Sequence, residues 1–143
     1  MKKSVSVLAI LMVCAICVLS LAGCGDRTLD GRYKSVEAYI ADPTVKATIE
    51  ESIATEADGL EIEVKGTENE LIYEYVFDEV YDAATVEIMK SSFESGTASL
   101  ESTFVDVANS LVDVVAADDI GVIVRYINGD GTVIFEETYK ADK

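Results

Sequence analysis

Residues 60–77 read LEIEVKGTENELIYEYVF, and their apolar side chains recur at every second position. This period of two is typical of β-strands with one buried face. The segment GTEN at residues 66–69 interrupts the pattern with turn-forming residues, and the pattern resumes at residues 71–77. The stretch therefore predicts two strands joined as a β-hairpin.

A second β-hairpin is predicted at residues 120–139. Two runs of alternating apolar residues flank Asn128-Gly129-Asp130-Gly131. Asn-Gly is a strong hairpin signal because both central residues of a type I′ turn have positive φ. We therefore expect the chain to reverse across these four residues.

Each hairpin follows a helical region. In the first region, Ser35 is expected to cap a short helix, and Asp42-Pro43 to start a second helix that ends at Gly59. The second region, residues 86–114, shows apolar residues at intervals of three and four. Gly96 lies within it, and we expect the helix to break or kink there.

These elements predict an α+β fold. Two helix-plus-β-hairpin units are expected to form a four-stranded antiparallel sheet packed against helices, in a single domain. The face that meets the helices is expected to carry Leu60, Ile62, Val64, Tyr73, Phe77, Val122, Val124 and Phe135.

The N-terminus carries a targeting pattern. Met1, Lys2 and Lys3 form a short positive segment, residues 5–21 are apolar, and Leu21-Ala22-Gly23-Cys24 resembles the lipobox of bacterial prolipoproteins. The resemblance implies a signal peptide at residues 1–23, cleavage before Cys24, and a diacylglyceryl group with palmitate-like chains on its thiol. The competing interpretation is a transmembrane helix at residues 5–21, which is near the lower limit of length for a membrane span.

This pattern also predicts where the mature protein resides. Its lipid would hold it at the outer, extracytoplasmic face of the cell membrane, and Gly25 after the cysteine makes the pattern similar to that of Gram-positive lipoproteins. Residues 24–34 are polar and are expected to form the lipid anchor and a tether. Residues 35–143 are expected to form the single α+β domain.

Composition argues against several classes of function. The chain has 27 Asp and Glu against 11 Lys and Arg, a net charge of −16 that disfavours binding to nucleic acid. It has no His, and its cysteines are Cys14, Cys17 and Cys24, so the domain lacks the residues of Ser-His-Asp and Cys-His catalysis. We expect no enzyme activity and no cofactor.

Part of the second hairpin matches a calcium-binding loop. Asn128, Asp130 and Glu137 fall at three of its ligand positions, with Gly131 at the position of its glycine. Tyr126, however, stands where the first acidic ligand belongs, and a hairpin turn explains the same residues without metal. We therefore predict no metal site, with Asn128, Asp130 and Glu137 as a weak alternative.

Paired acidic residues are a further source of possible chemistry. Asp118-Asp119 precedes a predicted strand, and Asp78-Glu79 and Asp82 lie at a predicted helix start, where carboxylates complement the helix dipole. Two carboxylates can hydrolyse a glycoside when they face each other across a cleft. In a small domain without Trp, an envelope hydrolase is the least favoured alternative.

The predicted outer face of the sheet is apolar for a surface exposed to water. The side chains expected there are Ile72, Val76, Ile123, Ile127 and Ile134, beside Glu74 and Arg125. Either the helices of residues 35–56 cover this face, or it is a protein-binding or dimerisation patch. Pairing of an edge strand with a partner is a related route to binding.

Three segments resemble a known family. SVEAYI at residues 35–40, DPTVKATI at residues 42–49 and GLEIEV at residues 59–64 are similar to a family of small uncharacterised domains found mainly in Gram-positive exported lipoproteins. The resemblance covers roughly Ser35 to Tyr139. It implies the same anchor and a single domain, and it carries no catalytic residue.

The sequence therefore predicts a membrane-anchored extracytoplasmic lipoprotein that acts as a non-catalytic protein-interaction module. Its expected partner is another envelope or secreted protein. The alternative is a small-ligand or cation-binding lipoprotein that uses Tyr73, Tyr75 and Tyr126 with nearby acids. The oligomeric state stays open.

Overall fold

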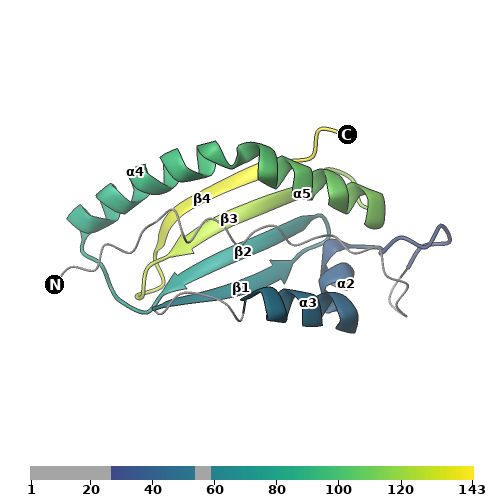
Figure 1. Cartoon of the computed structure of the whole chain (residues 1–143), viewed down its shortest axis with the longest axis horizontal. Coiled ribbons are helices and arrows are strands. Elements are labelled where there is room, and N and C mark those ends of the chain that lie inside the picture. The colour runs from purple at the N-terminus through teal and green to yellow at the C-terminus, as the bar shows by residue number, and fades with distance from the viewer. Residues whose placement is uncertain (1–26, 54–58) are drawn as a thin grey trace.

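The computed structural model describes residues 27–53 and 59–143, and the chain forms an α+β fold, as predicted. The elements are α2 (Val36–Ala41), α3 (Pro43–Ile53), β1 (Leu60–Gly66), β2 (Glu70–Phe77), α4 (Ala83–Ser99), α5 (Glu101–Val114), β3 (Gly121–Ile127) and β4 (Val133–Lys140). Figure 1 shows the strands side by side, with α4 and α5 following one another along the sheet. Within the described ranges, no helix has the length and apolar character needed to cross a membrane.

The four strands form one sheet in the order β1-β2-β3-β4 (Figure 1). β1 with β2, and β3 with β4, form the two predicted antiparallel hairpins, but the central strands β2 and β3 are parallel. The prediction of a fully antiparallel sheet is therefore wrong. The helices α4 and α5 carry the chain back along the sheet, so that β3 starts at the same end as β2.

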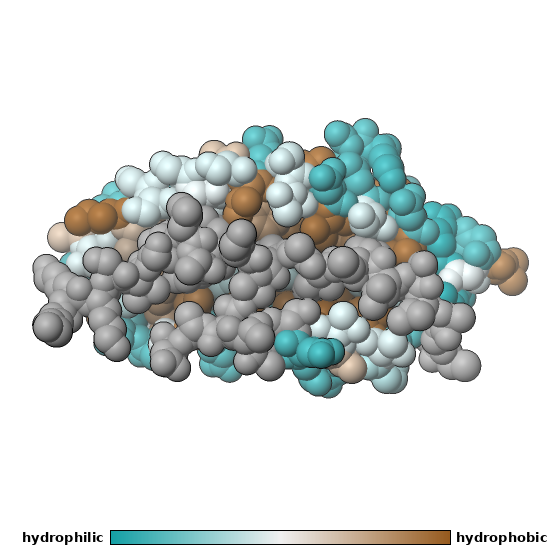
Figure 2. Space-filling model, in the orientation of Figure 1, coloured by the Kyte–Doolittle hydropathy of each residue, from teal (hydrophilic) through white to brown (hydrophobic). Residues whose placement is uncertain are grey.

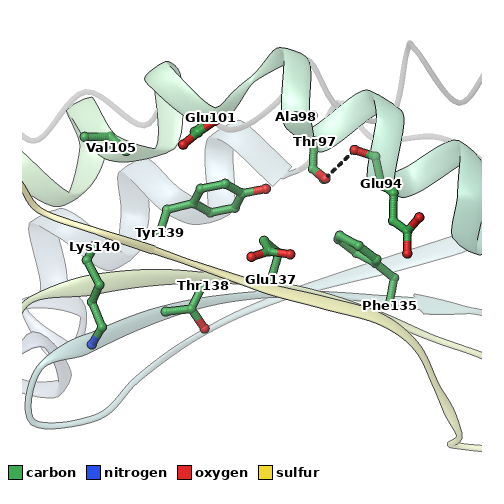
Figure 3. Close-up of a pocket in the computed structure, with 10 residues that line it drawn as sticks. All are labelled: Glu94, Thr97, Ala98, Glu101, Val105, Phe135, Glu137, Thr138, Tyr139 and Lys140. Carbon is green, nitrogen blue, oxygen red and sulfur yellow. Dashed lines mark hydrogen bonds between the residues drawn. The ribbon is translucent and has the colours of Figure 1, made fainter.

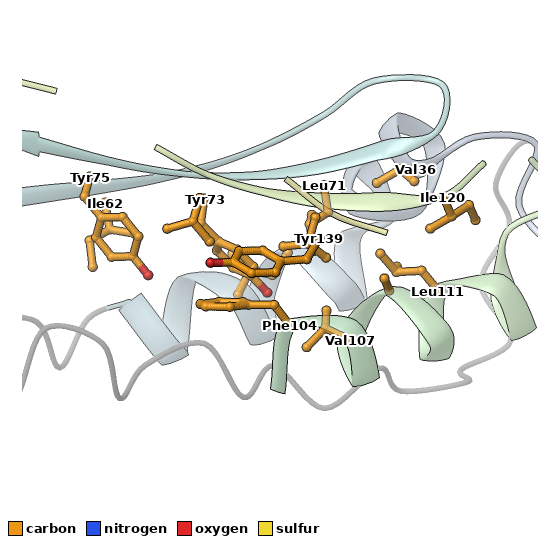
Figure 4. Packing of buried hydrophobic residues seen from close by; sticks show 14 of the residues in the cluster. Val36, Ile62, Leu71, Tyr73, Tyr75, Phe104, Val107, Leu111, Ile120 and Tyr139 are labelled. Atoms are coloured by element: carbon orange, nitrogen blue, oxygen red, sulfur yellow. The ribbon is translucent and has the colours of Figure 1, made fainter. Parts of the chain in front are cut away.

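One face of the sheet carries the core. The core cluster includes every second residue of β2 from Leu71 to Phe77 and every second residue of β3 from Val122 to Tyr126. Each described helix also contributes apolar residues to it. α4 and α5 contact β4, α5 also contacts β3, and α2 contacts β1 and β2. Figure 4 shows side chains of this cluster between the strands and α5. The described helices therefore all pack on the same side of the sheet.

The centre of the core is an aromatic stack. Tyr75 of β2 stacks on Tyr126 of β3, with 4.8 Å between ring centroids, and Tyr126 stacks on Phe93 of α4 at 3.9 Å. All three side chains are buried, and Tyr73 is buried as well. The tyrosines that the alternative function would use for ligand binding are thus core residues.

Helix starts follow the local signals. The Ser35 side chain accepts a hydrogen bond from the Ala38 N–H (3.0 Å), and Asp42 accepts one from the Thr44 N–H (2.9 Å) at the start of α3. Gly59 has a φ of +89°, the left-handed conformation predicted for it. The last part of the predicted second helix, residues 54–58, lies outside the described residues.

The long helical region is interrupted, although not at Gly96. α4 continues through Gly96, and the break is at Leu100, whose N–H donates to the Thr97 carbonyl (2.9 Å). Side-chain hydroxyls near this end donate to carbonyls four residues earlier, as Thr97 does to Phe93 (2.7 Å) and Ser99 to Ser95 (3.1 Å). Such bonds compete with the backbone ladder and weaken the helix end. The expected break at Gly96 is wrong because a single helical glycine costs only about 1 kcal/mol relative to Ala.

The second hairpin reverses where predicted, but its turn is of another type. The Gly131 N–H donates to the Asn128 carbonyl (2.8 Å), and Gly131, with a φ of +88°, is the left-handed residue of the turn. Neither Asn128 nor Gly129 has a positive φ. The arrangement matches a type I turn closed by a left-handed glycine, which is common in longer hairpin loops.

Candidate functional site

The outer face of the sheet does not form the continuous apolar patch expected from the sequence. Ile72, Ile123 and Ile134 are only 9%, 7% and 5% exposed, and Val76 and Ile127 are half-buried. Ile134 lies at the irregularity in the β3–β4 register and belongs to the core cluster. The first helices do not cover this face either, because their buried residues pack into the core on the opposite side.

A ladder of charged side chains crosses this outer face from β1 to β4. Lys65 lies 2.7 Å from both Glu63 and Glu74, and Arg125 contacts Glu74 (3.0 Å) and Glu136. Glu74 is itself only 7% exposed. Hydrogen bonds from Lys65 and Arg125 hold the pKa of Glu74 below its ordinary value, against the opposing effect of burial. The ladder thus keeps a nearly buried carboxylate ionised.

This charged ladder separates two apolar rows. Ile72 and Ile123 are register partners on one side of it, and Val76 and Ile127 are register partners on the other. Long charged side chains can cover apolar neighbours with their aliphatic stems. The low exposure of Ile72 and Ile123 therefore needs no second layer of helices.

A pocket opens at the edge of the sheet, between β4 and the junction of α4 with α5 (Figure 3). Its volume is about 330 Å³. It is lined by Glu94, Thr97, Ala98, Glu101, Val105, Phe135, Glu137, Thr138, Tyr139 and Lys140. Glu94, Thr97 and Ala98 come from the last part of α4, and Glu101 and Val105 come from the first part of α5.

Three carboxylates, from Glu94, Glu101 and Glu137, make this pocket acidic. Lys140 at the pocket is already bound to the Asp119 carboxylate (3.1 Å). Within the described ranges, no three acidic side chains are arranged to hold a metal ion. The carboxylates therefore act as separate negative charges around the pocket.

Aromatic residues form the apolar part of the pocket. The Tyr139 ring stacks on Phe104, with 4.8 Å between centroids, and its side chain extends under Thr97 and Glu101 (Figure 3). Burial raises the pKa of Tyr139, and the nearby carboxylates of Glu137 and Glu101 act in the same direction. A hydrogen bond with Thr97 opposes this increase in the pKa of Tyr139.

β4 is an edge strand of the sheet. It pairs with β3 on one side, and no strand of the described part of the chain pairs with its other side. Glu136, Glu137 and Thr138 are exposed along it. An edge strand presents N–H and C=O groups that can pair with an added strand. The acidic pocket lies beside these groups.

The β3–β4 turn is locked to the loop between β2 and α4. The buried Asn128 side chain accepts a hydrogen bond from the Tyr81 N–H (2.8 Å) and donates one to the Tyr81 carbonyl (3.0 Å). The Gly129 N–H donates to the Glu79 carbonyl (3.1 Å), and a Cβ at Gly129 would lie 2.6 Å from that oxygen. This contact between the turn and the loop therefore requires an amide side chain at position 128 and a glycine at position 129.

The residues of the calcium alternative have separate structural roles. The Asn128 side chain is bound to Tyr81, and Asp130 accepts hydrogen bonds from the backbone and hydroxyl of Thr132 inside the turn. Glu137 lines the edge pocket on β4. The structure does not bring these three side chains together as a group that could hold a metal ion.

The acidic pairs also serve the fold. Asp82 caps α4 by accepting from the Thr85 N–H (2.8 Å), and this hydrogen bond lowers the pKa of Asp82. Asp119 has a φ of +57° and accepts a hydrogen bond from Asn69 through its carbonyl (3.2 Å). Cys24, the predicted lipidation site, lies outside the described residues.

Sequence reasoning missed the edge pocket, although one signal for it exists. Glu137 occupies the same strand parity as Phe135 and Tyr139, so a charged residue interrupts the core-facing side of β4. Glu94 near the end of α4 and Glu101 at the start of α5 come from the other side of the pocket. Only the packing of α4 and α5 on β4 brings the two sets together.

Comparison with known proteins identifies the domain but not an activity. No curated protein and no solved structure matches the chain. The model of a domain of unknown function, DUF4854, matches residues 36–139. This range is close to Ser35 to Tyr139, the range that the family resemblance implied. Because this match covers most of the chain, the protein belongs to the DUF4854 family.

Proposed function

We propose that this chain is a membrane-anchored extracytoplasmic lipoprotein that works as a non-catalytic binding module for an extended, basic segment of another envelope or secreted protein. The lipobox-like sequence ending at Cys24 supports the anchor. The observation that carries the binding mode is the outer edge of β4, which pairs with no strand of the described residues and lies beside an acidic pocket.

The proposed binding mode follows from the geometry of β4. A segment that lies along β4 would extend the sheet by one strand and gain main-chain hydrogen bonds. Because side chains alternate along a strand, every second one would face the helix side, where the pocket lies. The pocket would take a Lys or Arg side chain, with its stem against Phe135 and Tyr139 and its charge near Glu94, Glu101 and Glu137.

The charge of the whole chain supports a basic partner. A net charge of −16 attracts a basic segment and repels acidic ones, which favours encounter with the right class of partner. The edge pocket adds a local charge that a basic side chain neutralises. We expect no catalysis, since residues 25–143 contain neither His nor Cys.

A small cationic ligand is the second candidate, because the same three carboxylates would attract it. Such a ligand would use the pocket but not the strand edge. It would also not use Tyr73, Tyr75 or Tyr126, which lie in the core. An envelope hydrolase remains the least favoured alternative.

A photo-crosslinking residue at Thr138 tests the binding mode in the lipidated protein on intact cells. Thr138 is exposed on β4 and lines the pocket, while Glu61, exposed on the other edge strand, is the matched control position. We expect position 138 to capture one envelope or secreted protein through a peptide that contains Lys or Arg, and position 61 not to capture it. Equal capture from both positions would contradict binding along β4.

Charge reversal separates the two candidates. Glu94→Lys with Glu101→Lys should abolish the crosslink from position 138, whereas Glu87→Lys, an exposed position of α4 outside this pocket, should leave it unchanged. If no protein is captured, binding of spermidine to the purified protein is measured by calorimetry. Spermidine binding that disappears in the Glu94 and Glu101 variant would favour the small-ligand candidate instead.

A further inference from the structure

The segment just before α2 forms a closed loop. The Thr28 N–H donates to the Arg32 carbonyl (2.7 Å), and the Gly31 N–H donates to the Thr28 carbonyl (3.0 Å). Gly31 has a φ of +86°, which allows the tight reversal. The Arg27 guanidinium closes the loop from the other side by donating to the Gly31 carbonyl (2.7 Å).

This loop is attached firmly to the domain through Tyr33. Its N–H donates to the Val114 carbonyl (2.8 Å), and its carbonyl accepts from the Ala116 N–H (2.7 Å). The Tyr33 hydroxyl donates to Asp42 (2.8 Å), and the Arg27 guanidinium lies 4.1 Å from the centre of the Tyr33 ring. Residues 27–34, which the sequence suggested as part of a tether, therefore lie against the domain.

The loop presents Leu29 to solvent. Leu29 is 110% exposed, the highest value among the large hydrophobic residues that the structure exposes. A leucine side chain exposed at the tip of a loop contributes no apolar burial to the fold. Its transfer from water into an apolar environment would be favourable. In Figure 1 this loop, drawn in purple, lies at one end of the long axis, opposite the β3–β4 turn. Figure 2 shows hydrophobic atoms projecting at the same end.

The position of Cys24 in the sequence brings this loop to the membrane. Only two residues separate Cys24 from Arg27. Even a fully extended chain would span only about 11 Å between the Cα atoms of these two residues. A lipid on Cys24 would therefore hold this end of the domain at the bilayer surface.

Charge favours the same orientation. Residues 27–34 contain Arg27, Arg32 and Lys34 but one acidic residue, Asp30, which pairs with Arg32 (2.8 Å), whereas the chain as a whole has a net charge of −16. Acidic surfaces are repelled by anionic lipid headgroups, and basic residues close to the surface are attracted to them. The basic excess of residues 27–34 therefore favours contact of this loop with an anionic bilayer.

We propose that a lipid bilayer is the partner of this loop, with Leu29 inserted at the boundary between headgroups and acyl chains and the long axis of the domain directed away from the membrane. This inference rests on the proposed lipid on Cys24. It adds a second membrane contact and a fixed orientation to that anchor. The two acyl chains of a diacylglyceryl group already attach the protein stably, and burial of Leu29 would add to this attachment and orient the domain. In this orientation the edge pocket and β4 would lie outside the bilayer, on the extracytoplasmic side, where a partner can reach them.

Fluorescence of a label at position 29 tests this orientation. After processing, Cys14 and Cys17 are lost with the leader and Cys24 is blocked by lipid, so the thiol of Leu29→Cys is the one that reacts. The labelled, lipidated protein is placed in vesicles of phosphatidylglycerol and phosphatidylcholine. We expect an NBD label at position 29 to shift to the blue and to be quenched by brominated acyl chains. The same label at Asp130→Cys, exposed in the opposite turn, should show neither effect.

The outcomes distinguish the orientation from the anchor. Mass spectrometry first establishes whether Cys24 carries lipid. If it does, and position 29 is quenched no more than position 130, the membrane contact of the loop is wrong while the anchor stands. If Cys24 carries no lipid, the anchor fails and the inference fails with it.

A substitution without a label gives a second readout. Leu29→Asn keeps the loop hydrogen bonds but removes the apolar side chain, and it should increase transfer of the lipidated protein to acceptor vesicles about tenfold. Val80→Asn, at a residue that is 64% exposed elsewhere on the domain, is the matched control and should leave the rate unchanged. Equal rates for the wild type and Leu29→Asn would overturn the proposal.

Discussion

The two faces of the sheet bury apolar residues by different means. On the inner face, helices pack against the strands, and the stack of Tyr75, Tyr126 and Phe93 fills the centre. On the outer face, Ile72 and Ile123 are almost as well buried, although the described helices all lie on the other side. Lys65 is the register partner of Ile72 and Arg125 lies two residues from Ile123, so their aliphatic stems are placed to cover these two side chains. Low exposure therefore does not by itself indicate a second packed layer.

The difference also concerns what stabilises each face. Burial of apolar area on the inner face involves no charged groups, so it is neither screened by salt nor dependent on the titration of acids. The outer face depends on an ionised Glu74 between Lys65 and Arg125, so its contribution should weaken with salt and with acid. Four experiments test this contrast.

Phe93→Ala should have the largest effect. The side chain is 1% exposed and stacks on Tyr126, so its removal leaves a cavity that the surrounding rings cannot fill. We expect a loss of about 3–5 kcal/mol in the free energy of unfolding, measured with urea. Phe93→Leu, which keeps most of the volume, should lose clearly less. Equal losses for the two variants would argue against the aromatic stack as the centre of the core.

Asn128→Ala should have the next largest effect. The variant removes both hydrogen bonds to the Tyr81 backbone in a buried site, and we expect a loss of about 2 kcal/mol. Asn128→Asp keeps an acceptor for the Tyr81 N–H but cannot donate to its carbonyl when ionised, so it should not restore full stability. Because this contact involves no ion pair, the decrease in the free energy of unfolding should not depend on salt. The same is expected for Phe93→Ala on the inner face. A strong salt dependence would contradict that assignment.

Glu74→Gln should have a smaller effect that depends on salt. It leaves Lys65 and Arg125 without the carboxylate between them, and we expect a loss of about 1–2 kcal/mol at low salt. Urea unfolding at low and high ionic strength measures the change. The matched control is Glu50→Gln in the exposed pair of Lys46 and Glu50, which should change stability by less than about 0.5 kcal/mol. If both variants behave alike, the ladder has no special role.

The pH dependence of the Glu74 contribution should be the smallest effect. The pKa of Glu74 is lowered from 4.5 in the folded protein, so the unfolded state binds more protons as the solution becomes acidic. Its contribution is therefore complete well above pH 4.5 and is lost as the pH falls through the lowered pKa. The stability difference between the wild type and Glu74→Gln should shrink over this range, whereas the Phe93→Ala difference should not. A Glu74 difference that does not change with pH would contradict the ladder.

Several features of the fold could be predicted because their causes are local. Ser35 and Asp42 cap helices through N–H groups two or three residues away, and both hairpins lie where the period of two predicts them. The positive φ of Gly59 was likewise predictable. Gly131 shows the limit of this reasoning, since the hairpin was predicted but the left-handed residue is not part of the Asn-Gly pair.

The candidate site was much less predictable. Glu94 and Glu137 line one pocket but lie on different elements, and nothing in the local pattern of either residue indicates the other. The spacing of Asn128 made it a weak candidate for a metal ligand. In the structure its side chain instead forms hydrogen bonds with the backbone of Tyr81, 47 positions away in the chain. Residue types indicated the acidic character of the site, whereas its location depends on contacts between distant segments.

The sequence by itself determined the family, the helix caps, the two hairpins and the strand face that packs against the helices, because these depend on residue spacing over a few positions. Tertiary structure decided the parallel pairing of β2 and β3, the break at Leu100, the charged ladder and the edge pocket. Alternation along a strand specifies which side is buried, but not which strand becomes its neighbour or in which direction. Those choices are made when α4 and α5 pack on β4 and carry the chain back to start β3 beside β2.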